Sequence, residues 1–246
     1  MSNPTSHNYN RRQFAKNLIA LIATAAIGKS SAVFAQPQQQ TYRLWRLYVK
    51  NTLTVTAIED LMREHGILYR LLLIYEEIAS RLTAGKEFAP AILADTADLI
   101  RRFVEDYHEK LEEDFVFPLA EKVSELYELV KVLRIQHQAG RSLTDTITRL
   151  VSQTSLQDPQ NQKKLVEYIH LFIRMYRPHA AREDTIIFPA FHDIITADEY
   201  VRLGEQFETR ETQLFGENGF EKIVEQVANL ETSLGIYDLT KFTPAV

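Results

Sequence analysis

Cysteine is absent from the 246 residues of this chain. Its absence excludes disulfides, thiolate zinc sites, iron–sulfur clusters and a cysteine nucleophile. Any metal ion must therefore be held by nitrogen and oxygen ligands. Glycine and proline are scarce, at 8 residues each. A chain with few helix-breaking residues and many leucine, alanine, glutamate and lysine residues favours long helices, so we expect an all-α fold.

Positive charge is in deficit, because the formal net charge is −5 at pH 7. Residues 1–35 contain basic residues and no acidic ones, so the rest of the chain is more acidic still. Proteins that bind nucleic acid are expected to carry a basic patch or stripe. We therefore expect no nucleic acid partner.

The N-terminal 35 residues have the order of an export signal. Arg11 and Arg12 precede an apolar run over residues 18–27, and small residues follow up to Ala35. The run is shorter than the roughly 20 residues that span a bilayer, which favours a signal peptide over a transmembrane helix. The paired arginines resemble a twin-arginine (Tat) signal. We expect residues 1–35 to engage the Tat translocon and direct export to the periplasm or another extracytoplasmic compartment, leaving no stable transmembrane segment in the mature chain. An amphipathic N-terminal helix or membrane anchor is the alternative.

The rest of the chain divides into three parts. Glutamine-rich residues 36–52 are typical of a polar linker. Residues 53–195 are expected to form an antiparallel four-helix bundle, because apolar residues recur there at spacings of three and four. The four helices are expected at about 53–85, 90–115, 120–151 and 162–188, with Pro118 and Pro189 ending the second and the fourth. Residues 196–246 should form an extension of two short helices, the first capped by Thr196 and Glu199 and the second ended by Gly235, with an extended tail.

Two segments of the bundle carry the same motif. His108 is followed by Glu112, and His179 is followed by Glu183, both at a spacing of four. In each copy an aromatic-proline pair closes the motif, with the proline ten residues after the histidine. Residues at this spacing share one face of a helix, so an imidazole and a carboxylate can reach one metal centre.

A further histidine precedes each motif at nearly the same distance. His65 lies 43 residues before His108, and His137 lies 42 residues before His179. The bundle is therefore an internal repeat of a helix pair, and its four inner faces would offer four imidazoles and two carboxylates. This donor set suits two iron ions, or manganese. One His-x-x-x-Glu alone is usually a surface ion pair, but two copies with matched prolines and matched upstream histidines are hard to explain in that way.

Over residues 56–189 these motifs resemble the hemerythrin-like (HHE cation-binding) family, in its bacterial branch with four histidines and two glutamates. The resemblance implies two non-haem iron ions, bridged by the two glutamates, that meet dioxygen or, in some members, peroxide or nitric oxide. It places the metal ligands at His65, His108, Glu112, His137, His179 and Glu183.

One position departs from the oxygen-carrying members of that family. They have a fifth histidine four residues after the histidine of the third helix, where this chain has Arg141. One iron would lose a ligand, and this loss disfavours simple reversible oxygen carriage. His170 lies nine residues before His179, about 180° around the helix, so we expect it to face away from the metals.

Five polar residues near the motifs allow more than one interpretation. The acids Glu109, Glu113 and Asp184 are expected on the surface, with an auxiliary ligand role open for Glu109. Tyr69 and Tyr176 lie one turn from His65 and His179 and are either core residues or hydrogen-bond partners of the site.

The sequence leaves the function open between several classes. The chain is a diiron protein that binds or senses a small ligand, a diiron oxidase or peroxidase, or an iron-binding and storage protein. A purely structural bundle is disfavoured, because burying these ligands without a metal would be costly.

Overall fold

The structure is a computed structural model that describes residues 55–151 and 156–244. The predicted signal peptide and linker, residues 1–52, lie outside the described residues. Residues Val55–Val246 form one compact unit. Its described part contains helices and no strands. None of its helices is long and apolar enough to cross a membrane.

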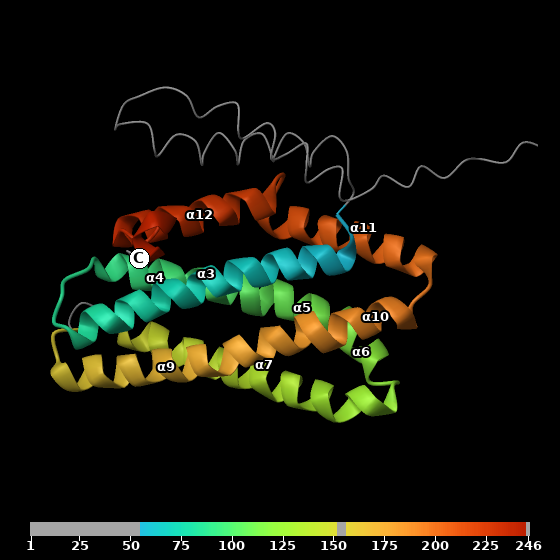
Figure 1. Ribbon diagram of the computed structural model, residues 1–246, viewed down its shortest axis with the longest axis horizontal. Coiled ribbons are helices and arrows are strands. Elements are labelled where there is room, and N and C mark those ends of the chain that lie inside the picture. Colours follow the sequence, from blue (N-terminus) through green and yellow to red (C-terminus); the bar gives the residue numbers. More distant parts are fainter. Residues whose placement is uncertain (1–54, 152–155, 245–246) are drawn as a thin grey trace, which may run out of the picture. The chain divides into compact units, whose positions relative to one another are not determined.

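Four long helices run antiparallel along the molecule, which confirms the predicted bundle (Figure 1). The first bundle helix is α3 (Ala57–Thr83) and the third is α7 (Ser124–Leu150). The second runs without a break over residues 90–120 through α4 (Pro90–Leu99), η1 (Ile100–His108), α5 (Glu109–Leu111), η2 (Glu112–Val116) and α6 (Phe117–Ala120). The fourth runs over residues 159–194 through α9 (Pro159–Arg182), η3 (Glu183–Ile187) and α10 (Phe188–Ile194). The segments η1, η2 and η3 are π-helical.

The first bundle helix starts at a reciprocal cap that the sequence analysis did not recognise. The Thr56 side chain accepts a hydrogen bond from the Glu59 N–H, and the Glu59 side chain accepts one from the Thr56 N–H. Such a box satisfies two of the backbone donors that a helix start leaves unpaired. The helix therefore starts at Ala57, four residues later than expected.

The two prolines do not end their helices, so this prediction was wrong. The Phe117 N–H donates to the Glu112 carbonyl, and the Phe188 N–H donates to the Glu183 carbonyl, in each case five residues back. A proline has no N–H to donate, and its ring clashes with the carbonyl four residues earlier in a regular helix. The wider π turn before each proline relieves that conflict. The helices consequently continue to Ala120 and Ile194.

The C-terminal extension forms α11 (Ala197–Phe215) and α12 (Gly219–Leu234). The predicted box of Thr196 and Glu199 caps α11, and Gly235 ends α12 in the left-handed conformation at a φ of 73°. The tail is not wholly extended as expected, because a short 3-10 helix, η4 (Leu239–Phe242), interrupts it.

Polar and aromatic contacts attach this extension to the bundle, with α12 lying along α3 (Figure 1). Arg70 of α3 donates from Nε to Glu231 Oε1 at 2.9 Å, and this pair is partly buried. On the second bundle helix, Phe103 and Tyr107 pack their rings against Phe215. The extension thus covers the outer side of the two helices that carry His65 and His108.

Candidate metal centre

All six predicted ligands lie together inside the bundle, and each of its four helices contributes one or two of them. Each is at most 3% exposed. His65 comes from α3, and His137 comes from α7. The two motifs supply the other four from the second and fourth bundle helices, in each case with the glutamate opening a π turn. The structure therefore brings together all six predicted ligands.

The six residues form two groups of three. In the first, Glu112 Oε1 lies 3.6 Å from His108 Nε2 and 3.9 Å from His65 Nε2. In the second, Glu183 lies 3.1 Å from His179 Nε2 through Oε2 and 3.9 Å from His137 Nε2 through Oε1. Each group has the two imidazoles and one carboxylate that would hold one metal ion.

Each carboxylate also reaches the other group. Glu112 Oε2 lies 3.5 Å from His137 Nε2, and Glu183 Oε2 lies 3.4 Å from His65 Nε2. The two glutamates thus lie between the groups, where a carboxylate can bridge two metal ions.

The Nδ1 atom of each of the four imidazoles, its outer nitrogen, lies close to a side-chain oxygen. Each of these oxygens belongs to a residue that is adjacent in sequence to another predicted ligand. His65 Nδ1 lies 2.8 Å from Asp184, and His137 Nδ1 lies 3.1 Å from Glu113. In both cases the acid directly follows the glutamate of a motif, so the two halves of the repeat match.

The two motif histidines, His108 and His179, share a second pattern of hydrogen-bond partners. His108 Nδ1 lies 2.7 Å from Glu64, and His179 Nδ1 lies 2.9 Å from Gln136 Oε1. Glu64 directly precedes His65, and Gln136 directly precedes His137. Such outer hydrogen bonds orient an imidazole and direct its other nitrogen to a metal.

The second group shows most directly that the residues suit a cation. Glu113 and Gln136 Oε1 accept hydrogen bonds, so the Nδ1 atoms of His137 and His179 carry the protons. Their Nε2 atoms then face each other inside the bundle, only 3.1 Å apart. None of the four oxygens of Glu112 and Glu183 accepts a hydrogen bond from the residues that the structure describes. Buried lone pairs that face one another repel unless a proton or a metal cation lies between them.

Burial and neighbouring charges shift the pKa values of the two central carboxyls in opposite directions. Burial and the facing Glu183 raise the pKa of Glu112 well above its usual value. Burial alone would also raise the pKa of Glu183, but the imidazoles of His179 and His65 lower it below its usual range. The pKa of His137 falls to about 4, mainly because burial disfavours its cation. A metal ion would replace these protons as the positive charge of the site.

Glu109 and Arg141 lie beside the second group and not on the surface. Glu109 is 1% exposed, so the expectation of a surface acid was wrong for it. Tyr176 Oη donates to Glu109 Oε1 at 2.6 Å, and Arg141 Nη2 lies 2.7 Å from Glu109 Oε2. Tyr176 is thus a buried partner of this acid, while Tyr69 donates to Asp184 Oδ2 at 3.1 Å. The Arg141 side chain turns inward, where it contacts the carboxylates of Glu109 and Glu113.

Sequence reasoning missed Glu64 and Gln136 as partners of the ligand imidazoles. A signal was present, since each stands directly before a predicted ligand histidine. It could not be read without the structure, because each contacts a histidine of another helix, more than 40 residues away. The prediction for His170 fits the structure, in which this residue is exposed.

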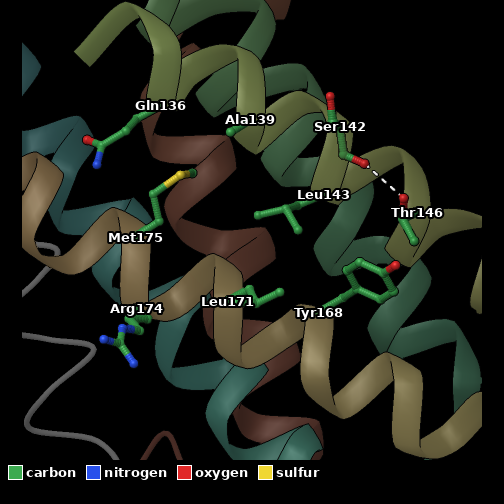
Figure 2. Close-up of a pocket in the computed structure, with 9 residues that line it drawn as sticks. All are labelled: Gln136, Ala139, Ser142, Leu143, Thr146, Tyr168, Leu171, Arg174 and Met175. Carbon is green, nitrogen blue, oxygen red and sulfur yellow. Dashed lines mark hydrogen bonds between the residues drawn. The ribbon is translucent and has the colours of Figure 1, made fainter. Parts of the chain in front are cut away.

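A surface groove of about 600 Å³ runs between α7 and α9, beside this site (Figure 2). Gln136 lies at one end of the groove, and Thr146 and Tyr168 lie toward the other. Gln136 is thus both part of the wall of the groove and the partner of His179. None of the six predicted ligands lines the groove.

Comparisons with known proteins match this arrangement to one family. The model of the hemerythrin HHE cation-binding domain matches residues 56–192. Uncharacterized proteins of Mycobacterium bovis and of two Mycobacterium tuberculosis strains are 48% identical to this chain over 191 residues. The aligned part covers 78% of this chain and 75% of each relative. No solved structure matches the chain.

The hydrogen bond from Tyr176 to Glu109 depends on a glycine. A Cβ at Gly140 would lie 1.9 Å from Tyr176 Oη, so Gly140→Ala must displace the tyrosine. We expect this change to lower the free energy of unfolding by about 1–3 kcal/mol, which is typical of overpacking a core. Gly66→Ala is the matched control, because its Cβ would meet nothing within 4 Å. It should raise the free energy of unfolding by about 0.5–1 kcal/mol, because glycine is less favourable than alanine in a helix interior. Urea unfolding of both variants measures the difference, and equal effects would contradict this role of Gly140.

Proposed function

We propose a function from the premise that the chain belongs to the hemerythrin HHE cation-binding domain family and is a metal-binding hemerythrin-like protein. The protein holds two non-haem iron ions that bind or react with dioxygen or a related small ligand. Peroxide and nitric oxide are the related ligands. The observation that carries the proposal is that His137 Nε2 and His179 Nε2 face each other at 3.1 Å, beside buried Glu112 and Glu183 oxygens that accept no hydrogen bond from the described residues.

The chain's own residues would each have a defined task. The four imidazoles bind through Nε2, because their outer nitrogens are engaged by Asp184, Glu64, Glu113 and Gln136. Glu112 and Glu183 lie between the two groups and would be shared by both ions. Iron in this donor set supplies a ferrous–ferric couple and coordination positions for exogenous ligands.

The metal content tests the proposed ligands. Protein reconstituted with ferrous iron under anaerobic conditions should contain two iron ions per chain. Glu112→Ala and Glu183→Ala should each lose one or both ions, because each carboxylate would contact both. His170→Ala, which alters an exposed histidine of α9, should retain the wild-type content. Elemental analysis after gel filtration makes the measurement, and a wild-type protein with one zinc ion or no transition metal would refute the dinuclear iron site.

Ligand binding tests the proposed reactivity. Azide, a small anion, should give a saturable change in the visible spectrum of the oxidised iron protein, since each iron would have only two imidazoles and shared carboxylates as ligands. The reduced iron protein should become oxidised when it is mixed with dioxygen in a stopped-flow instrument. Zinc-loaded protein is the control and should do neither, because zinc has no redox chemistry. An iron-loaded protein that remains indifferent to both azide and dioxygen would exclude this function.

We further propose that the protein is exported by the Tat route. The support is the arrangement of paired arginines, apolar run and small residues in positions 1–35. Transport in the folded state suits a protein whose metal ions are inserted before export.

Replacement of Arg11 and Arg12 by lysine tests this route. The double variant should accumulate in the cytoplasm, because the paired arginines are the feature by which the translocon recognises its substrate. Cell fractionation followed by immunoblotting measures its location, with Lys16→Arg as a control that keeps the pair and the charge. Undiminished export of the double variant would show that another route is used.

A further inference from the structure

A third group of ligand-type atoms lies beside the two proposed metal positions. Glu109, Glu113 and His137 offer three such atoms within 4.8 Å of one another. His137 Nδ1 lies 3.1 Å from Glu113 Oε1 and 4.0 Å from Glu109 Oε2. Two carboxylates and an imidazole nitrogen would suit a divalent cation.

This third group already contains a cation. Arg141 Nη2 lies 2.7 Å from Glu109 Oε2 and donates to Glu113 Oε1 at 2.8 Å. The guanidinium therefore contacts both carboxylates at the place where an ion would lie. Its side chain is 16% exposed, so solvent screens these contacts only in part.

The internal repeat shows that the arginine and the extra acid belong together. Tyr69 follows His65 by four residues, as Arg141 follows His137. Ala180 follows His179 by one residue, as Glu109 follows His108. The other half of the bundle thus has neither the additional carboxylate nor the cation that balances it.

We propose that Arg141 is a resident cation that fills a third cation site formed by Glu109, Glu113 and His137, and so limits the protein to two metal ions. The same contact holds Glu113 against His137 Nδ1. It thereby keeps His137 directed through Nε2 into the dinuclear centre. An ion in the third site would instead bind Nδ1, the Nδ1 proton would leave to solvent, and His137 would become an imidazolate shared by two ions. The inference rests on the proposed function for the role of His137 as a ligand.

The test counts bound cobalt. Metal-free protein is loaded with excess Co²⁺, passed through gel filtration and analysed for metal per chain. Arg141→Met removes the charge and keeps an unbranched side chain, so this variant should bind one more ion than the wild type. Arg141→Lys keeps a cation and should bind the wild-type number. The additional ion should also change the visible cobalt spectrum, because its ligands are mainly oxygen.

Two further variants separate a cation site from a loss of packing. Arg141→Met combined with Glu109→Gln should return to the wild-type number, since the site then lacks one charge. Arg141→Tyr combined with Glu109→Ala copies the other half of the repeat, and it should fold and bind the wild-type number. An unchanged or reduced cobalt content in folded Arg141→Met overturns the proposal. If Arg141→Met does not fold, Arg141→Gln takes its place with the same expected gain.

The failure of this inference is distinguishable from failure of the proposed function. The experiment depends on the difference between variant and wild type. A wild type that holds fewer than two ions would refute the dinuclear centre. An additional ion in Arg141→Met would still support the third site in that case.

Discussion

The structure depends on the burial of four imidazoles and two carboxylates within a helical core. Taking these groups out of water is costly unless each finds a partner, and the four central carboxyl oxygens accept no hydrogen bond from the described residues. Cations at the centre would turn this cost into attraction, because each proposed ion would compensate one group of three side chains. The outer partners then have a clear physical purpose, because they fix which nitrogen of each ring carries the proton.

The helix geometry around the site follows from the same requirement. Each motif places a glutamate at the start of a π turn, and a proline follows six residues later. The proline makes a regular helix unfavourable, and the wider turn removes the conflict without ending the helix. Glu112 and Glu183 are thereby presented from helices that continue beyond the site on both sides. π turns occur frequently at functional sites, and here the sequence supplies the reason.

The two halves of the bundle are related but unequal. The predicted ligands of the two halves match in position, and so do the acids Asp184 and Glu113. Gln136 stands at the position equivalent to Glu64, so an amide takes the place of a carboxylate there. The half that contains His137 also has Glu109, Arg141 and Tyr176 in one buried network. Gly140 makes room for that network, because any side chain there would collide with the tyrosine. The inequality would give the two proposed metal positions different electrostatic surroundings.

The sequence by itself determined the all-α bundle and the six residues at its centre. Helical periodicity and a spacing of four depend only on local geometry, so the pairs His108–Glu112 and His179–Glu183 could be recognised directly. Their duplication then identified His65 and His137. The tertiary structure alone decided which neighbours serve those ligands. Glu64 and Gln136 act across the bundle on histidines of other helices, and the packing of α7 against the second bundle helix buries Glu109 beside Arg141. Helix periodicity specifies the face on which a residue lies, but its partner and its exposure depend on which helix packs against that face.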